Sequence, residues 1–408
     1  MRVNIQNKNT SFIWILILYS ILSITPIADQ LVSPVLLPLI FGLMLLFVVH
    51  RERIIFSKGV SLFIILFFIL DLLYHILGIS ERIGNAITRF LFFGAIIIYL
   101  YLKDNFIEKE KKMVFFTLLF IIVINIVDNI RLNAMYPLAS ILAIKQGESY
   151  RGLNIGTTMF NTMSLLFYVV CFFMLINTKK IRDRLIYASM CVAAFIYIFY
   201  YGMRGSVVTI LFIITLLMLL VRFVGKYKIL WLLVPLLIVP IANPNFIFDL
   251  VSGILPEGRL VDRLDDIQNV TQEGVDDASL SGRVYFYKVS LETWSGNLSN
   301  FLFGIGEHRA SAMALGNDVV GVGGHSEFID ILARWGAVGA IVVIVIFVKY
   351  YWILIAQTND KQLRNQARIL YLALLLCGFF KSIFSSYIGI VSFILMPLAV
   401  WMIDNERN

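Results

Sequence analysis

The sequence predicts an all-α, polytopic membrane protein with about twelve transmembrane helices. Three observations support this fold class. Of the 408 residues, 60% are hydrophobic and 15% are charged, and the mean hydropathy is +0.86. Apolar windows of roughly 17 to 25 residues, the length that crosses a bilayer, recur along the chain. Basic residues cluster in alternate loops between these windows, which is the pattern of an inserted membrane protein.

The apolar windows give the predicted spans in chain order. They cover 12–28, 31–49, 59–78, 83–102, 112–131, 158–177, 185–201, 206–222, 229–243, 325–349, 366–386 and 388–403. The first window follows a basic start, as the apolar region of a signal peptide does. Because many further spans follow it, we predict an uncleaved first helix.

The loops between the spans predict the orientation. Basic clusters occur near 51–58, 103–112, 179–184, 222–228 and 361–368, all on one side of the predicted bundle. By the positive-inside rule this side is the cytoplasm, and both termini lie there. Membrane insertion accounts for the formal net charge of +8, so no nucleic-acid partner is expected.

This topology divides the chain into three parts. Residues 1–243 form an N-terminal transmembrane bundle with an outer loop near 132–156, residues 244–324 form a large outer (periplasmic) loop, and residues 325–408 form the C-terminal helices. The large loop is the only stretch outside the spans that is long enough to form a small folded cap. Its acidic residues, such as Asp262 and Asp277, are typical of a solvated face.

Neither a disulfide framework nor a metal site is indicated. Cys171, Cys191 and Cys377 lie far apart in apolar runs, where cysteine is usually a packing residue. The chain contains no Asp-x-Asp pair, the motif through which many nucleotide-sugar enzymes hold a divalent metal. We therefore expect chemistry that uses no metal and no other cofactor.

Two charged residues within predicted spans should form an ion pair. Asp71 lies about seven residues before the outer end of the third span, and Arg89 lies about six residues after the outer start of the fourth. At a rise of about 1.5 Å per residue they sit at nearly equal depth on adjacent antiparallel helices. Such a pair either braces the hairpin or contributes to a polar cavity.

The outer face carries several cations that suit an anionic ligand. Arg151, Arg204 and Arg283 each stand beside a glycine, which leaves room for a bulky group, and Lys381 lies near the outer end of the eleventh span. Arginine suits phosphate because its planar fork donates two parallel hydrogen bonds. A lipid diphosphate carrying a sugar is the expected ligand, while membrane-surface snorkelling is the alternative for Arg204 and Lys381.

A histidine stands at the mouth of the tenth span. His325 begins a run that includes Phe328, Leu332 and Gly336 at helical spacing, so it should lie in the first turn of that helix. The positive end of the helix dipole disfavours the imidazolium there and leaves a neutral ring able to accept a proton. His325 is therefore a candidate general base, and a surface histidine that caps the helix is the alternative.

These residues resemble the O-antigen ligase and O-antigen polymerase superfamily. His325-Ser326, nine further residues and then Gly336-Ala337-Val338-Gly339 match its His-[Asn/Ser/Gln]-x9-Gly-x-x-Gly pattern. The stretch from Ser281-Gly282-Arg283 to Phe303-Gly304-Ile305-Gly306 is similar to the one that precedes this pattern in the family. The resemblance covers the C-terminal two thirds of the chain and implies a GT-C-like glycosyltransferase.

The resemblance implies glycosyl transfer on the outer face of the bacterial cytoplasmic membrane. Arg151, Arg204 and Arg283 would hold the diphosphate of a polyprenyl-linked glycan donor, where negative charge grows in the transition state. His325 would take the proton of the acceptor hydroxyl as that hydroxyl attacks the anomeric carbon, with inversion. The implied partners are this donor, a glycan acceptor, membrane lipid and a regulator of chain length.

Four further charged residues are candidates for supporting roles. Glu327 and Asp330 follow His325 closely and would orient it or the sugar, unless both are simply solvated. Lys381 and Arg89 complete the set of supporting cations.

Three alternatives to a polymerase of lipid-linked repeat units remain open. A ligase would move the finished glycan to lipid A core or to a protein, and the shared motif does not separate the two activities. The short stretch between Gly306 and His325 leaves little room for an insertion that grips a bulky acceptor, which favours the polymerase. A flippase or transporter should show repeated halves with matched broken helices, which the sequence lacks. A scaffold protein would need no outer-face cations.

Overall fold

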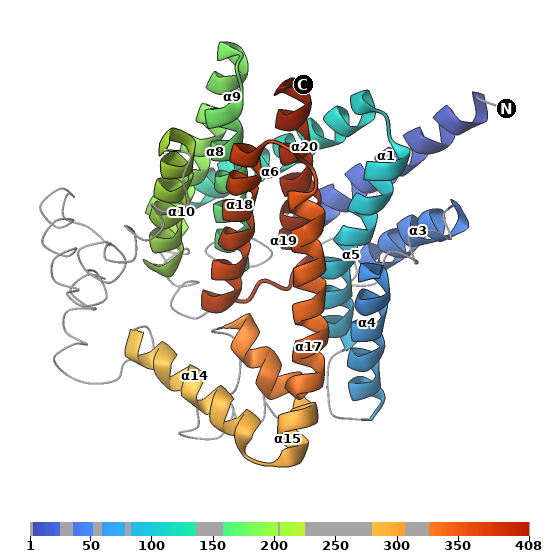
Figure 1. Ribbon diagram of the computed structural model, residues 1–408, viewed down its shortest axis with the longest axis vertical. Coiled ribbons are helices and arrows are strands. Elements are labelled where there is room, and N and C mark those ends of the chain that lie inside the picture. Colours follow the sequence, from blue (N-terminus) through green and yellow to red (C-terminus); the bar gives the residue numbers. More distant parts are fainter. Residues whose placement is uncertain are drawn as a thin grey trace, which may run out of the picture.

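In the computed structural model, the described residues are 3–24, 36–51, 59–77, 83–135, 158–202, 205–224, 280–306 and 326–407. All regular structure within these ranges is helical (Figure 1). The helices are α1 (Val3–Ile24), α3 (Leu36–Arg51), α4 (Val60–Ile76), α5 (Ile83–Asn105), α6 (Glu108–Met135), α8 (Thr158–Asn177), α9 (Ile181–Ile196), α10 (Gly205–Val224), α14 (Leu280–Ser295), α15 (Leu298–Phe303), α17 (Glu327–Ile355), α18 (Lys361–Phe380), α19 (Ser386–Ile390) and α20 (Met396–Arg407). Two π-helical turns, η2 (Tyr197–Gly202) and η4 (Val391–Leu395), extend α9 and join α19 to α20.

The helices support a polytopic membrane protein. Among the described residues, five stretches are long and apolar enough to cross a membrane: Ile83–Asn105, Glu108–Leu132, Met159–Asn177, Glu327–Ile355 and Ser386–Arg407. Shorter apolar helices occupy Thr10–Ile24, Leu36–Val49, Val60–Ile76 and Val207–Phe223. Each predicted span overlaps a helix except 229–243, which lies outside the described residues. The total of about twelve spans stays a prediction.

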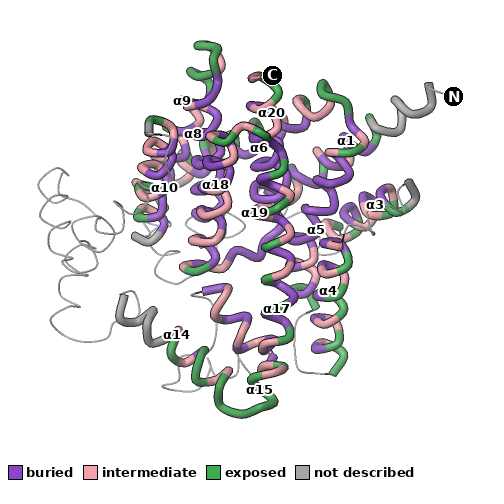
Figure 2. The backbone as a smooth tube through the Cα atoms, in the orientation of Figure 1, coloured by how far each residue is buried: buried purple, intermediate pink, exposed green. Residues whose placement is uncertain are grey.

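The core of the bundle lies along α5, α8 and the run from α19 to α20. These helices are buried over most of their length, whereas α3 and α4 expose one side (Figure 2). Small residues set the close approaches: a Cβ added at Gly389 of α19 would lie 2.7 Å from the carbonyl oxygen of Phe92 in α5. The rings of Phe92, Phe93 and Phe393 then fill the space between these helices, in edge-to-face and stacked contacts.

Helix α17 is bent at Gly336. This glycine has φ 62° and ψ −166°, so it cannot continue the helical hydrogen-bond pattern, and the segment from Glu327 to Trp335 is inclined to the long segment that follows (Figure 1). The predicted stripe from His325 through Gly336 is therefore wrong beyond Leu332. The helix begins at Glu327, with Ser326 as its N-cap. His325, which was predicted to lie in the first turn, is outside the described residues.

The predicted eleventh span also ends differently. Helix α18 stops at Phe380, and the chain runs in a non-helical turn until Ser385, whose hydroxyl caps α19. Phe328 of α17 packs against Gly378 so closely that a Cβ there would meet the ring at 2.6 Å. This contact and the bond from the Glu327 amide to the Lys381 carbonyl, at 3.4 Å, hold the turn against the start of α17.

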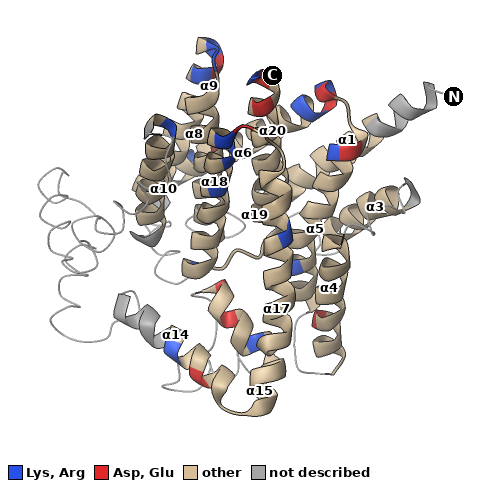
Figure 3. Cartoon of the chain, in the orientation of Figure 1, with Lys and Arg blue, Asp and Glu red and all other residues tan. Residues whose placement is uncertain are grey.

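Charged residues gather at one end of the bundle. Figure 3 shows them at the upper ends of α9, α18 and α20, while α14 and α15 lie at the opposite end, beside the bend of α17. Helices α14 and α15 belong to the predicted large loop, 244–324, and its residues 244–279 and 307–324 lie outside the described residues. The division into three parts stays a prediction.

Candidate functional site

The start of α17 is held by its own first-turn residues. The hydroxyl of Ser326 accepts a hydrogen bond from the amide of Ile329, at 3.4 Å, and so satisfies one of the amides that every helix start leaves without a partner. Glu327 and Asp330 place carboxylates in the first turn, where the helix dipole favours negative charge. This helix end is thus stabilised by residues of the helix itself.

Glu327 joins α17 to the turn after α18. Its Oε2 accepts hydrogen bonds from the hydroxyl of Ser382, at 2.5 Å, and from the backbone amide of Ile383, at 3.1 Å. Its Oε1 lies 3.7 Å from Nη1 of Arg334, two turns further along α17. The side chain is 3% exposed, and a carboxylate buried to this extent needs such partners to offset its lost hydration.

Asp330 joins α17 to the cap helix α14. Its Oδ1 accepts a hydrogen bond from the hydroxyl of Ser290, at 3.1 Å, and both side chains are buried. The charge of Arg334 acts on Asp330 as well as on Glu327, so one cation serves both carboxylates. A second hydrogen bond, from the Tyr287 hydroxyl to the Phe379 carbonyl at 3.0 Å, connects α14 to the end of α18.

Helix α15 docks into the bend of α17 through its backbone. The amide of Ile305 donates to the carbonyl of Ala333, at 2.8 Å, and the hydroxyl of Tyr74 on α4 donates to the carbonyl of Phe303. Gly304 has φ 73°, and a Cβ there would lie 2.4 Å from the Arg334 carbonyl. A Cβ at Gly336 would lie 2.4 Å from the Leu302 carbonyl in the same way, so two glycines allow two backbones to cross.

The predicted pair of Asp71 and Arg89 is confirmed. Nε of Arg89 lies 2.6 Å from Oδ2 of Asp71, and Nη2 lies 2.9 Å from Oδ1, which is a two-point contact between buried side chains. Trp335 adds a third link because its Nε1 donates to Oδ1 of Asp71 at 3.3 Å while its ring lies 4.6 Å from the Arg89 guanidinium. Trp335 directly precedes Gly336, so this pair braces the bend of α17 as well as the hairpin of α4 and α5.

The structure brings together some of the predicted site residues. Glu327 and Asp330 lie within one turn of each other and are buried, so the alternative that they are solvated is wrong. Lys381 is 7% exposed in the turn that Glu327 contacts, which disagrees with a snorkelling role. Arg89 lies apart from them in the brace with Asp71 and Trp335.

The other predicted residues are placed in part or not at all. Arg283 lies in the first turn of α14, and by helical spacing its position shares a stripe with Tyr287 and Ser290, which face α18 and α17. His325, Arg151 and Arg204 lie outside the described residues. Their roles stay predictions.

Sequence reasoning missed three residues that build the site. Arg334 stands four residues after Asp330, and this spacing on a helix is a readable sign of an ion pair. Ser290 and Ser382 gave no such signal, because a serine that serves a distant carboxylate looks like any other serine. In the part of the chain that the structure describes, no group of three or more His, Cys, Asp or Glu side chains gathers as metal ligands would.

Ser326, Glu327, Asp330 and Arg334, with the serines that contact them, form a frame at the start of α17. The two carboxylates are committed to this frame, because each is engaged by a serine and by Arg334.

A model of a known protein family matches this part of the chain. The model, described as O-antigen ligase, matches residues 161–344, from the start of α8 to the middle of α17. This match is narrower than the resemblance expected from the sequence, and it includes positions 204, 283 and 325 but not Arg151, Arg89 or Lys381. No curated protein matches the chain.

Proposed function

We propose that this chain is an inverting glycosyltransferase that polymerises oligosaccharide repeat units linked to polyprenyl diphosphate, because a model of the O-antigen ligase family matches its residues 161–344. The family supports glycan transfer of the polymerase or ligase type. The observation that carries the finer proposal is the docking of α14, which bears Arg283, on the first turns of α17, directly after His325.

The proposed reaction is a single displacement at the anomeric carbon. His325 accepts the proton of the acceptor hydroxyl as the oxygen of that hydroxyl forms the new glycosidic bond. The bond between the anomeric carbon and the diphosphate oxygen breaks, and polyprenyl diphosphate leaves with the electron pair. Arg151, Arg204 and Arg283 stabilise the charge that develops on this leaving group, so that neither a metal nor another cofactor is needed.

The frame explains how the base is positioned in this proposal. The two residues that follow His325 are held in place. Ser326 is held by its helix-cap hydrogen bond, and Glu327 by its hydrogen bonds from Ser382 and Ile383. Glu327 and Asp330 are positioning residues, since their contacts are with the protein. Lys381 adds positive charge beside them, and Arg89 acts further away through Trp335.

The distribution of charge supports an active site on the outer face. The basic ends of α9 and α18 lie together, opposite α14 and α15 (Figure 3). With the basic end in the cytoplasm, both termini are cytoplasmic and the cap lies on the outer face of the cytoplasmic membrane. Donor and acceptor lipids, and a regulator of chain length, would approach from that side.

The first test is a surface-polysaccharide gel of a deletion strain that carries either the wild-type gene or His325→Ala. Deletion should leave the final acceptor with a single repeat unit, and wild type should restore the long ladder. His325→Ala should not restore it, because loss of a general base slows transfer about 10² to 10⁴-fold. The matched control is His308→Ala, a histidine of the predicted loop 244–324 that precedes His325, which should restore the ladder at equal protein level.

Two outcomes would overturn this proposal. A bare acceptor with long chains accumulated on the polyprenyl carrier would make the protein a ligase, the activity that the family description names. An unchanged ladder in the deletion strain would remove glycan transfer altogether and leave a transporter or scaffold as the better explanation.

A further inference from the structure

A groove opens at the charged end of the bundle, away from the proposed active site. It lies between the end of α8, the start of α9 and the end of α10, and its volume is about 360 Å³. Leu175, Ile176 and Phe223 form its apolar wall, and Arg184 and Arg222 contribute its polar side. Phe223 is 81% exposed, so its ring is open to contact with a hydrocarbon chain at the edge of the groove.

Within the described ranges, the two arginines of this groove donate hydrogen bonds to neutral groups only. Nε of Arg184 donates to the carbonyl of Thr178, at 2.6 Å, and Nη1 of Arg222 lies 3.3 Å from Oε1 of Gln362. Among the described residues neither arginine pairs with a carboxylate. Both guanidinium groups therefore keep donors and a full positive charge for a further ligand.

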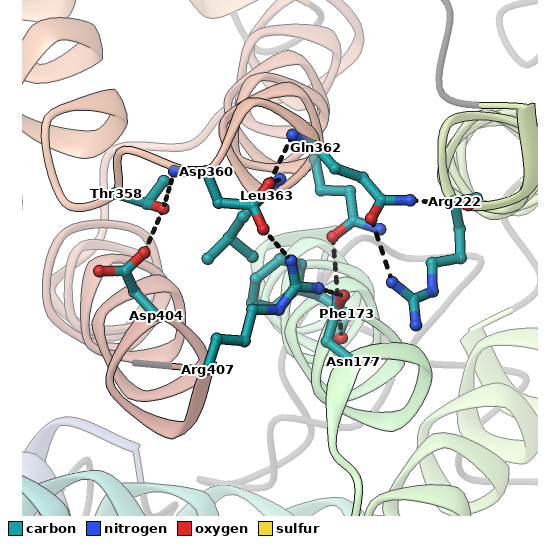
Figure 4. A network of polar contacts seen from close by, with 10 residues as sticks. Phe173, Asn177, Arg222, Thr358, Asp360, Gln362, Leu363, Asp404 and Arg407 are labelled. Carbon is teal, nitrogen blue, oxygen red and sulfur yellow. Dashed lines mark hydrogen bonds and ion pairs between the residues drawn. The ribbon is translucent and has the colours of Figure 1, made fainter.

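The surroundings of the groove raise its positive potential. Arg184 and Arg407 both lie close enough to repel Arg222, while Asp360 is the neighbouring carboxylate. Figure 4 shows that Asp360 is engaged elsewhere, because Arg407 pairs with it and also donates to Oδ1 of Asn177 at 2.7 Å. Of the charged groups that act on Arg222, two are arginines, and the one carboxylate, Asp360, is paired with Arg407.

We propose that this groove binds an anionic phospholipid, with its phosphate held by Arg184 and Arg222 and an acyl chain along Leu175, Ile176 and Phe223. Two features select this ligand over a soluble anion. Two arginines that line the same groove suit a phosphate, and basic pockets between membrane helices take anionic headgroups. The apolar wall, which ends at the exposed ring of Phe223, suits a hydrocarbon chain and offers no favourable contact to a free ion.

The test is native mass spectrometry of the full-length protein with defined lipids. Wild type, purified in a non-ionic detergent, should retain phosphatidylglycerol in preference to phosphatidylcholine of the same acyl chains. Replacing both arginines (Arg184→Gln with Arg222→Gln) should weaken phosphatidylglycerol retention about tenfold or more, because each arginine adds favourable contact with an anionic lipid. Phosphatidylcholine retention should not change.

The chain offers a matched control. Arg131 lines another surface groove, with Val123, Ile124, Val127 and Asp128, but it is paired with Asp128 at 2.7 Å. Arg131→Gln should leave phosphatidylglycerol retention at the wild-type level. If the double variant fails to fold, Arg184→Gln alone and the salt dependence of wild-type retention make the same distinction, since headgroup binding weakens with salt.

Three results would overturn the proposal. Equal retention of the two lipids by wild type would mean that the arginines serve only membrane orientation. An equal loss on Arg131→Gln would mean that any surface arginine suffices. Displacement of phosphatidylglycerol by millimolar inorganic phosphate would assign the groove to a soluble anion. None of these results depends on glycan transfer, so this proposal and the proposed function stand or fall separately.

Discussion

Gly304 and Gly336 allow two stretches of backbone to cross without any side chain between them. Each has a positive φ, of 73° and 62°, and a Cβ at either position would lie 2.4 Å from a backbone carbonyl of the other stretch. Relief of such a clash must move backbone, which is harder than moving the end of a side chain. These residues therefore fix the position of α15 on α17.

We expect Gly336→Ala to destabilise the protein by about 2 to 5 kcal/mol, since left-handed strain and overpacking add. The measurement is the thermal unfolding midpoint in detergent. Gly42→Ala is the control, because nothing lies within 4 Å of a Cβ there and alanine favours the helix. An unchanged midpoint for Gly336→Ala would mean that α15 is not held by this crossing.

The brace of Asp71 and Arg89 gives a second prediction at the same scale. Asp71→Asn should cost about 3 to 5 kcal/mol, because it leaves a buried guanidinium without its counter-charge. Exchanging the two residues should restore only part of this stability, since an arginine at position 71 cannot accept the bond from Nε1 of Trp335.

A mutant cycle with Trp335→Phe separates the two links of this brace. In wild type, Trp335→Phe removes a hydrogen bond to a carboxylate and should lower the free energy of unfolding by about 1.5 to 3 kcal/mol. In the variant with Asp71 and Arg89 exchanged, this bond is already absent, so Trp335→Phe should lower the free energy of unfolding little further. Full rescue by the exchange alone would show that Trp335 contributes nothing to the pair.

At the scale of the element, α18 is fixed at its start by Asp360. The Oδ1 of this residue accepts hydrogen bonds from the amides of Gln362, at 2.7 Å, and Leu363, at 3.1 Å, and its other oxygen pairs with Arg407 of α20 (Figure 4). Burial by itself would raise the pKa of Asp360, but these hydrogen bonds and the charge of Arg407 outweigh it and the pKa is lowered. The N-cap thus ties two helices together.

This lowered pKa predicts how stability depends on pH. The contribution of Asp360 is fully present above the unfolded-state pKa of about 3.9 and is lost as pH falls through the lower folded-state pKa. Asp360→Asn keeps a capping side chain but loses the charge, so its unfolding midpoint should fall less steeply than that of wild type below about pH 4. The effect is small, because the carboxylate is 36% exposed.

Individual elements also show what the sequence could predict. Asp71 and Arg89 could be paired because depth on two adjacent helices follows from residue counting alone. The bend at Gly336 could not be predicted, because it depends on the backbone of Leu302 in another element, and a glycine in an apolar run looks the same whether it bends or packs. The end of α18 was missed for a related reason, since the turn at Lys381 is held by Glu327 from α17.

At the scale of the whole molecule, the two ends of the bundle have different characters. One end carries the polar network around Asp360 and Arg407, and the other carries α14, α15 and the start of α17. Hydropathy and the spread of basic residues predicted this polarity, because both are properties of long stretches. The candidate base and two of the three candidate diphosphate-binding arginines lie outside the described residues. The sequence pattern and the family match support His325 and Arg204, and the sequence pattern alone supports Arg151.

The bond between Trp335 and Asp71 also bears on how the chain is made. Asp71 and Arg89 are 18 residues apart, whereas Trp335 follows Asp71 by 264 residues. The pair is complete once Arg89 is made, 246 residues before Trp335. At a synthesis rate of about 5 to 20 residues per second, it waits roughly 12 to 49 seconds for its third member. During that interval the salt bridge alone offsets the two charges, and Trp335 adds its hydrogen bond to Asp71 afterwards.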